Sequence, residues 1–385
     1  MKTKFFIASA VALVTIACQK EQPTQFEVAS PEGVNKISFS LESGAPSYSV
    51  THGEKTVLNP SKLGFVFKNA DSLNTNFEIA GIKERTFDDT WEQVWGEKKE
   101  IRNNYNELVV ELQEKDEAKR KLNIEFRAFD DGVAFRYVFP EQGIKDSIFI
   151  MDELTTFNLK DDGKAWWIPA YGEQRYEYLF NNDPVSTLDT VHTPLTIESK
   201  SGLSLSFHEA NLVDFASTTL AHTEGTTLKT DLVPWADGVK VRTTESFKTP
   251  WRTIQIGEKP TDLITSYLIL NLNEPNKIED TSWIKPFKYL GIWWAMHIGK
   301  YTFWEGEKQG ATTKHAKEYI DFAEKVDIDH LLIEGWNKGW TPDWYKNAMH
   351  QFSFTKEADN FDLEEVTDYA KRHNVRIIGY HEPGS

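Results

Sequence analysis

The chain has 385 residues, which at roughly 150 residues per domain predicts about two domains with a sizeable hydrophobic core. Lysine and arginine total 43 and aspartate and glutamate total 59, so the formal net charge is -16. This negative charge argues against a nucleic-acid partner, because phosphates repel an acidic protein. The single cysteine excludes an internal disulfide framework and a thiolate zinc cluster.

Residues 1–18 are predicted to be a lipoprotein signal peptide. Lys2 and Lys4 precede the apolar run Phe5–Ile16, which is typical of an export signal and short for a membrane span. The segment Val14–Cys18 resembles a bacterial lipobox, with Thr15 where leucine is preferred, and it predicts lipidation of Cys18. We therefore expect a periplasmic or outer-membrane lipoprotein that is held to the membrane by its lipid anchor only, with plain secretion as the alternative. Residues 19–31 are polar and are predicted to form a tether.

Residues 32–275 have the pattern of an antiparallel β-sandwich. Apolar and polar residues alternate over 122–128, the turn residues Asp130, Asp131 and Gly132 follow, and alternation resumes over 133–139, which predicts a β-hairpin. Shorter alternating runs occur at 37–41, 203–207 and 239–241. Many short strands separated by turns predict an all-β super-sandwich domain.

The pattern changes near residue 283. Apolar runs predict buried strands at 289–296, 330–334 and 375–380, and helical periodicity follows Thr312 and recurs at 361–373. This alternation predicts that residues 276–385 are the first three β/α units of a (β/α)8 TIM barrel. A Rossmann sheet would alternate in the same way, but no GxGxxG motif follows the first strand. A closed barrel needs eight units, so the chain is expected to be an N-terminal fragment with a truncated barrel.

Aromatic residues concentrate where this barrel would bind its substrate. Seven of the 13 tryptophans fall between 283 and 344, and four of them follow predicted strands: Trp304, Trp336, Trp340 and Trp344. Loops after barrel strands build the active site, and flat aromatic faces suit pyranose rings. The alternative is that these indoles fill the interface between the sandwich and the barrel.

Two glutamates end predicted barrel strands. Glu334 follows Ile333, and Glu382 follows His381. Carboxylates at this end of a barrel point into a shared pocket, and glycoside hydrolysis needs a pair of them. His381 would orient a carboxylate or a sugar hydroxyl. The alternatives are a glutamate that caps a helix or holds a lysine, and a histidine with a purely structural role.

At these residues the chain resembles glycoside hydrolase family 97, which includes the bacterial starch-utilisation α-glucosidase. The resemblance rests on Tyr289–Tyr301, Gly310–Thr313, Ile333–Asn337 and His381–Glu382, and in the front domain on Asp130–Tyr137, Trp167–Ala170 and Tyr176–Tyr178. It implies an N-terminal β-super-sandwich, a catalytic (β/α)8 barrel and a C-terminal β domain, of which the later parts would follow residue 385.

The family resemblance also implies a mechanism. Inverting α-glucosidases of the family carry a His-Glu pair at the third strand, whereas the retaining α-galactosidases lack it and use an aspartate nucleophile elsewhere. The pair His381 and Glu382 implies the inverting branch with Glu382 as general base, although Tyr380 stands where the first residue of a His-His-Glu pattern is usual. Contacts to an oligosaccharide substrate are expected from His381, Glu334, Trp336, Asn337 and Trp304.

The resemblance further implies a calcium ion held mainly by glutamates, one of which comes from the front domain. By motif this ligand is Glu177, with Glu173 as a weaker choice. Without the resemblance Glu177 would be assigned a structural role. Calcium needs six to eight oxygens, so the remaining ligands and the general acid are expected beyond Ser385, and this chain alone is expected to be inactive. The alternatives left open are a retaining α-galactosidase and a non-catalytic carbohydrate-binding sandwich.

Overall fold

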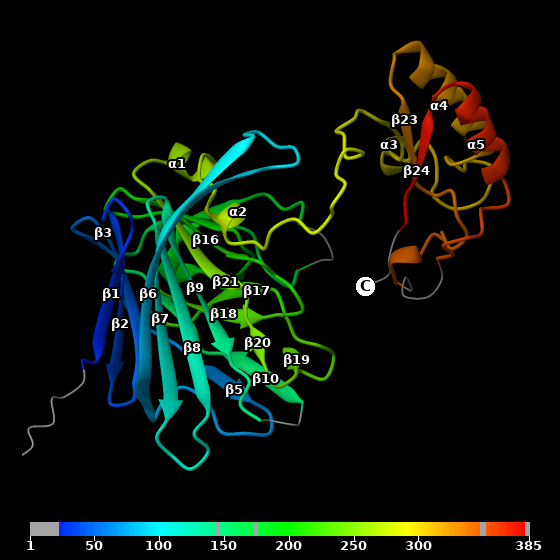
Figure 1. Ribbon diagram of the computed structural model, residues 1–385. Coiled ribbons are helices and arrows are strands. Elements are labelled where there is room, and N and C mark those ends of the chain that lie inside the picture. The colour runs from blue at the N-terminus through cyan, green and yellow to red at the C-terminus, as the bar shows by residue number, and fades with distance from the viewer. Residues whose placement is uncertain (1–22, 144–146, 173–175, 347–351, 382–385) are drawn as a thin grey trace, which may run out of the picture. The chain divides into compact units, whose positions relative to one another are not determined.

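The computed structural model describes residues 23–143, 147–172, 176–346 and 352–381. The chain divides into two compact units, with the division between Lys277 and Ile278. We call them unit 1 and unit 2 (Figure 1). None of the described helices is long and apolar enough to cross a membrane.

Unit 1 begins with a four-stranded antiparallel sheet in the order β1-β2-β3-β4. Its strands are β1 (Gln25–Ala29), β2 (Asn35–Glu42), β3 (Ala45–His52) and β4 (Lys55–Lys62). The tether predicted for residues 19–31 is therefore wrong in its second half. Phe26 and Val28 pair with Phe39 and Ile37 of β2, so two apolar residues among polar neighbours are enough to add a strand to the sheet.

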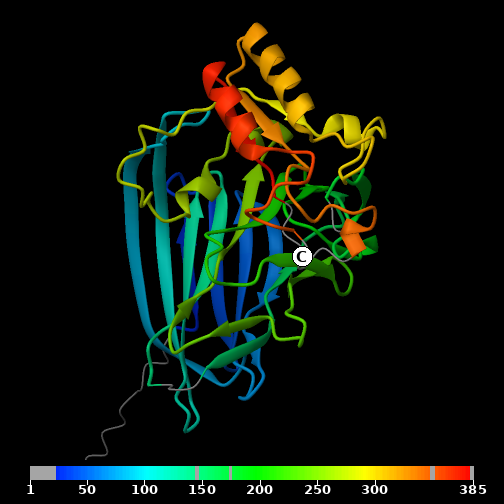
Figure 2. The ribbon, with the colours of Figure 1, turned by 90° about the vertical axis from the view of Figure 1, so that its right-hand side faces the viewer.

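A ten-stranded sheet forms the other main layer, in the order β13-β12-β15-β16-β21-β9-β8-β7-β6 with β20 paired to β9. Figure 2 shows its long strands side by side. The strands are β6 (Phe77–Glu92), β7 (Glu100–Glu114), β8 (Lys121–Phe129), β9 (Gly132–Phe139), β12 (Lys164–Trp167), β13 (Asn181–Pro184), β15 (Leu195–Glu198), β16 (Ser204–Ala210), β20 (Phe247–Lys248) and β21 (Trp251–Gly257).

Short elements complete unit 1. Two small sheets have the orders β19-β10-β5 and β11-β18-β17-β14. The elements are β5 (Phe65–Phe67), β10 (Ile148–Glu153), β11 (Thr156–Asn158), η1 (Val185–Thr187), β14 (Thr190–Val191), β17 (Thr218–His222), β18 (Thr227–Leu232), β19 (Val241–Thr243), α1 (Pro260–Ile264) and α2 (Leu268–Asn271).

The predicted hairpin is present as β8 and β9, in which Phe129 pairs with Gly132. Gly132 has a φ of +153°, and a Cβ there would lie 2.3 Å from the Ile254 carbonyl oxygen, so the turn requires glycine. Between the layers, Tyr48 of β3 packs on Phe135 of β9 with ring centroids 4.7 Å apart. The inward residues of both layers thus form the core of an antiparallel β-sandwich.

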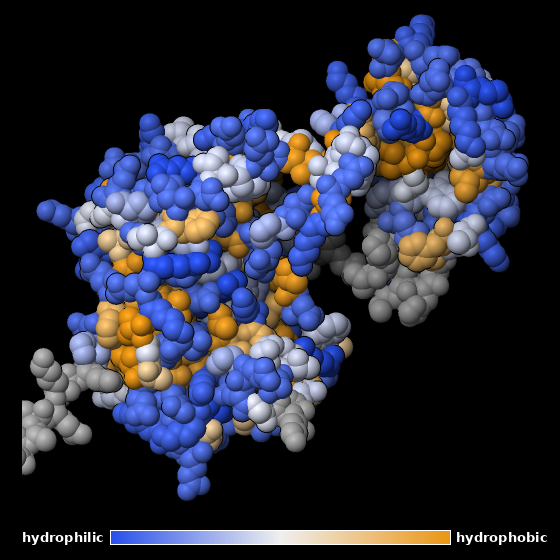
Figure 3. All heavy atoms as spheres, in the orientation of Figure 1, coloured by the Kyte–Doolittle hydropathy of each residue, from blue (hydrophilic) through white to orange (hydrophobic). Residues whose placement is uncertain are grey.

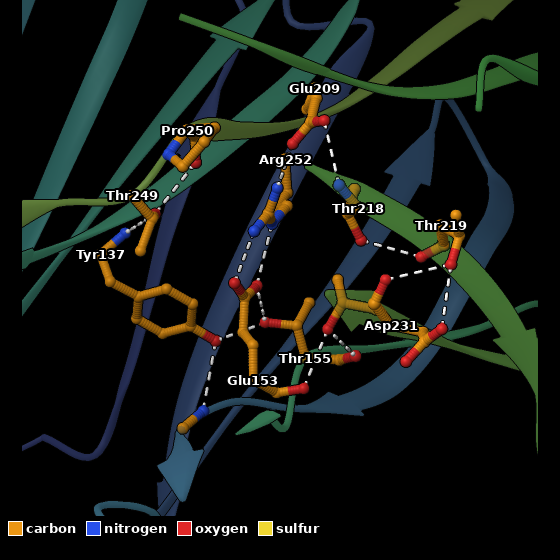
Figure 4. A network of polar contacts seen from close by, with 12 residues as sticks. Tyr137, Glu153, Thr155, Glu209, Thr218, Thr219, Asp231, Thr249, Pro250 and Arg252 are labelled. Carbon is orange, nitrogen blue, oxygen red and sulfur yellow. Dashed lines mark hydrogen bonds and ion pairs between the residues drawn. The ribbon is translucent and has the colours of Figure 1, made fainter. Parts of the chain in front are cut away.

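An ionic network is buried inside this sandwich. Arg252 is 1% exposed and binds Glu153 through Nε at 2.9 Å and Nη2 at 2.5 Å, and Glu209 through Nη1 at 2.8 Å (Figure 4). The Thr155 hydroxyl donates to Glu153 Oε1 at 2.8 Å. Burial alone would lower the pKa of Arg252, but the two glutamates hold it above its ordinary value. The buried charges are therefore satisfied by one another.

Most of the unit 1 surface seen in Figure 3 is hydrophilic, and its hydrophobic side chains form separate areas. This agrees with the many charged residues of the chain, because charged side chains are mostly exposed to water.

Unit 2 has a parallel sheet in the order β22-β23-β24. Its elements are β22 (Leu290–Ile292), α3 (Trp294–His297), α4 (Thr313–Lys325), β23 (His330–Ile333), η2 (Trp344–Lys346), α5 (Leu363–Arg372) and β24 (Arg376–Gly379). The predicted alternation of strands and helices is confirmed, and α4 and α5 lie side by side (Figure 2). The described residues give two β/α units and the strand of a third in an open sheet, and their continuation into a closed barrel stays a prediction.

Local signals explain both long helices. Thr312 and Asp362 accept hydrogen bonds from the backbone N–H groups of His315 and Glu365, and these caps begin α4 and α5. Each helix then buries its small and branched residues against the sheet: Ala316, Ile320, Ala323, Val366 and Ala370.

The single strand predicted for 289–296 is wrong in its second half. Pairing with β23 ends at Ile292, which lies opposite Ile333. Beyond this point the backbone bonds to itself, with the N–H of Met296 donating to the Trp293 carbonyl at 3.0 Å. The apolar run therefore turns into α3, and Trp293 and Trp294 are exposed.

Candidate functional site

The candidate site lies at the carboxyl ends of β23 and β24 in unit 2. Sheet pairing extends one residue past each strand: the N–H of Glu334 donates to the Ile292 carbonyl at 3.2 Å, and that of Tyr380 to the Ile333 carbonyl at 3.2 Å. Glu334 is half-buried there, and His381 follows Tyr380. The predicted residues Glu334 and His381 thus occupy the same edge of one sheet, where parallel β/α folds place their binding residues.

Trp336 crosses from the loop after β23 to the end of β24. Its Nε1 donates to the Tyr380 carbonyl at 2.8 Å, and the indole lies over Gly379, where a Cβ would be 3.5 Å from Nε1. Gly335 has a φ of +84°, which allows the turn that delivers the indole. The half-buried Trp336 therefore ties the two strand ends together and holds the backbone just before His381.

Asn337 is 1% exposed, and its amide organises the same loop. Nδ2 donates to the Ser353 carbonyl at 2.7 Å, and Oδ1 accepts from Trp340 Nε1 at 3.0 Å. Both ends of the amide bind protein groups, so Asn337 positions the loop. Its contact with substrate stays a prediction.

The tryptophans of the predicted cluster divide into different roles. Trp340 is buried and stacks on Phe303, with centroids 5.1 Å apart and planes at 18°, so the packing alternative describes it better than a sugar platform. The rings of Trp344 and Trp340 pack edge to face, with their centroids 5.2 Å apart. Trp304 is half-buried in the loop before α4, and its carbonyl accepts from the Thr302 hydroxyl at 2.9 Å.

His381 is held between aromatic rings. It stacks on Phe354 with centroids 3.6 Å apart and planes at 6°, and Phe352 meets it at 6.2 Å and 69°. Its Nε2 is buried, without a hydrogen-bond partner in the part of the chain that the structure describes.

The other predicted residues lie elsewhere. Glu382, Cys18 and the weaker calcium candidate Glu173 are outside the described residues. Glu177 belongs to unit 1, where its carboxylate is exposed and accepts from the N–H of Tyr176 at 3.1 Å.

A calcium ion needs more oxygens than one glutamate offers. Over the described ranges, no group of three or more histidine, cysteine, aspartate or glutamate side chains could hold a metal ion. These residues therefore do not complete a calcium site by themselves, and Glu177 can supply only one carboxylate to it.

The phenylalanines of this edge were missed by sequence reasoning. Phe303, Phe352 and Phe354 join Trp340 and His381 in one aromatic cluster, and His297 meets Phe303 at 5.4 Å. Their signal in the sequence is weak, since phenylalanines in loops are not distinguished from core residues by periodicity. The rings of this cluster come from the segments that follow β22, β23 and β24.

Lys338 is a second residue that the sequence did not single out. Its ammonium binds Asp359 at 2.5 Å and Glu305 at 3.0 Å, and these hydrogen bonds raise the pKa of Lys338. It links the loop before α4 to the segment before α5. The ion pairs are exposed, so they fix loop geometry more than they stabilise the fold.

Comparisons with known proteins agree with this architecture. The family model "Glycosyl-hydrolase 97 N-terminal" matches residues 28–275, and "Glycoside hydrolase 97" matches residues 293–383. A family 97 enzyme from Pseudoalteromonas sp. strain K8 in complex with acarbose is 45% identical, with a TM-score of 0.89, and the match covers 92% of this chain and 54% of that one. The same figures hold for a variant in complex with panose.

Curated relatives are more distant. A protein of Bacteroides thetaiotaomicron named retaining alpha-galactosidase is 25% identical over 99% of this chain and 59% of its own length. A probable retaining alpha-galactosidase of Streptomyces bingchenggensis is 26% identical over 96% of this chain and 54% of its own length. The chain thus spans little more than half the length of these relatives. The family models together cover both units, and the chain belongs to glycoside hydrolase family 97.

Proposed function

We propose that the whole protein hydrolyses α-glucosidic bonds of starch-derived oligosaccharides with inversion of configuration. The observation that carries this proposal is the 45% identity to a family 97 enzyme solved with acarbose and panose, which are α-linked oligosaccharides built on glucose-like rings. The candidate site supports it, because His381 and Glu334 occupy one edge of the parallel sheet.

In this proposal Glu382 is the general base. It removes a proton from a water molecule that attacks the anomeric carbon, while a general acid from the part of the protein beyond Ser385 protonates the leaving oxygen. An inverting pair stands about 6.5–9.5 Å apart, which leaves room for the water. His381, fixed by Phe354, orients the carboxylate or a sugar hydroxyl, and Glu334 binds hydroxyl groups of the same sugar.

A retaining α-galactosidase is the second candidate, favoured by the names of the curated relatives. Their identity of 25–26% is lower than that to the acarbose-binding enzyme. In addition, the His-Glu pair in the sequence supports the inverting branch, as the family resemblance implies. We therefore rank the glucosidase first.

The substrate test uses the full-length protein and compares kcat/KM for panose with that for an α-galactoside of similar length. We expect faster hydrolysis of panose by at least an order of magnitude, because a site built to hydrogen-bond one hydroxyl arrangement rejects its epimer. Preference for the galactoside would contradict the glucosidase proposal and support the second candidate.

We also propose that calcium assists this reaction, with Glu177 as one of its ligands. Excess EDTA should lower the activity of the full-length protein, and added Ca²⁺ should restore it. The Glu177→Gln variant should need more Ca²⁺ for half-maximal activity. Full activity in excess EDTA would count against the metal.

Export as a lipoprotein through Cys18 remains a proposal as well, and labelling with radioactive palmitate tests it. Label should enter the wild-type protein and be lost in Cys18→Ser. Equal labelling of both would contradict the proposal.

A further inference from the structure

We propose that Phe354 is an aromatic platform that binds one pyranose ring of the substrate on its outer face while its inner face fixes the plane of His381. The inference rests on the proposed function, since it names a sugar subsite within the same site. It assigns a ligand, a neutral hexopyranose unit, to a residue that the sequence did not identify.

The inner face of Phe354 is in contact with His381. The two ring centroids are 3.6 Å apart and the planes differ by 6°, so the rings are stacked in parallel. The ring of Phe352 packs edge to face with the same imidazole, with the two centroids 6.2 Å apart. The imidazole therefore has little freedom to rotate, and its unpartnered Nε2 has a fixed direction.

Phe354 is 74% exposed in spite of this stack, within the part of the protein that this chain spans. Single exposed hydrophobic residues are normal on protein surfaces, so exposure alone means little. Here the exposed ring also covers a residue of the candidate site. An open aromatic face at such a position is the surface on which the axial C–H groups of a pyranose pack.

The backbone around Phe354 is fixed by the preceding loop. The N–H of Ser353 donates to the Lys338 carbonyl at 2.9 Å, and the N–H of Lys338 donates to the Lys356 carbonyl at 2.9 Å. Asn337 Nδ2 adds a bond of 2.7 Å to the Ser353 carbonyl.

Ser353 also closes a local turn. Its Oγ accepts from the N–H groups of Thr355 at 3.2 Å and Lys356 at 2.9 Å. Phe354 is thus presented on an ordered turn, and a ligand that stacks on it loses little affinity to ordering of the loop. This also gives the buried amide of Asn337 a function, which is to hold the platform.

The test is panose binding, measured by titration calorimetry on the full-length Glu382→Gln protein, in which hydrolysis is suppressed. In that background Phe354→Ala should raise Kd about tenfold, the size expected for loss of one aromatic stack. Phe354→Tyr should keep Kd within about twofold, because it retains the ring. The matched control is Phe322→Ala, which removes a 53% exposed phenylalanine from α4 and should leave Kd unchanged.

The positioning half of the proposal has its own readout in the NMR spectrum of the full-length protein. The ring current of Phe354 should shift the His381 ring protons upfield, and Phe354→Ala should remove that shift. An unchanged Kd in Phe354→Ala would overturn the platform, and unchanged His381 resonances would overturn the positioning role. A failure of the proposed function is a different result, namely a wild-type enzyme that binds or cleaves no α-glucoside.

Discussion

The two units handle polar and aromatic groups in opposite ways. In unit 1, Arg252 and its partners Glu153 and Glu209 are buried and bonded to one another, so the network is complete without a ligand. At the strand ends of unit 2, His381 keeps an unpartnered Nε2 and Phe354 is exposed. A satisfied network contributes to a rigid scaffold, whereas a buried polar atom without a partner is the kind of group that the proposed sugar subsite would use. The following predictions test this difference, beginning with the largest effect.

Glu382→Gln in the full-length protein should lower kcat by roughly 10²–10⁴-fold, the usual contribution of general acid–base catalysis. The amide cannot accept the proton of the attacking water. The measurement is steady-state hydrolysis of panose, with Glu364→Gln on the surface of α5 as a control that should stay at the wild-type rate. An undiminished kcat would refute Glu382 as the base and weaken the assignment of unit 2 as the reactive unit.

Arg252→Met should lower the free energy of unfolding by about 3–5 kcal/mol, because it leaves Glu153 and Glu209 buried without their cation. Urea unfolding followed by tryptophan fluorescence measures the change. The control is Arg242→Met, whose ion pair with Asp237 is exposed and should be worth less than about 1 kcal/mol. Equal effects of the two substitutions would contradict the scaffold role of the buried network.

Thr312→Ala should destabilise α4 by about 1 kcal/mol, since it removes the oxygen that caps the N–H of His315. Hydrogen exchange of the first amides of α4 should become faster, while Thr312→Ser should retain most of their protection. Unchanged exchange in Thr312→Ala would show that packing of Ala316 and Ile320, rather than the cap, begins this helix.

The smallest effect is a pH dependence in unit 1. Burial lowers the pKa of His208, so the unfolded chain, with a histidine pKa of about 6.5, binds more protons than the folded one between the two values. The free energy of unfolding should therefore fall as the pH drops from 7 through about 6.5 and continue to fall down to the folded pKa. His208→Gln should flatten this slope in urea titrations at several pH values, and an unchanged slope would contradict the contribution of His208.

Sequence patterns predicted what depends on local periodicity. The β8–β9 hairpin follows from alternation around Gly132, and α4 and α5 follow from their caps and apolar spacing. The strand β1 was hidden in a polar segment, because only its pairing with β2 orders it. The end of β22 at Ile292 could not be foreseen, since the apolar run in the sequence continues to Met296 without a break.

The site was predicted only in part, because sequence patterns show which residues follow a strand but not which distant segments meet. Glu334 and His381 were found because they follow strands, which is a property of the chain order. The structural role of Asn337 and the stack of Phe354 on His381 depend on segments 16 residues or more apart in sequence. No spacing rule brings such residues together, and the buried Arg252 network is of the same kind.

The central claim is that hydrolysis at the strand ends of unit 2 proceeds by direct attack of water. Proton NMR of the first seconds of panose hydrolysis by the full-length protein measures the anomer formed before mutarotation. The account predicts that β-glucose appears first from the α-linked substrate. First appearance of the α-anomer would show retention through a covalent intermediate and would contradict Glu382 as the base of an inverting enzyme.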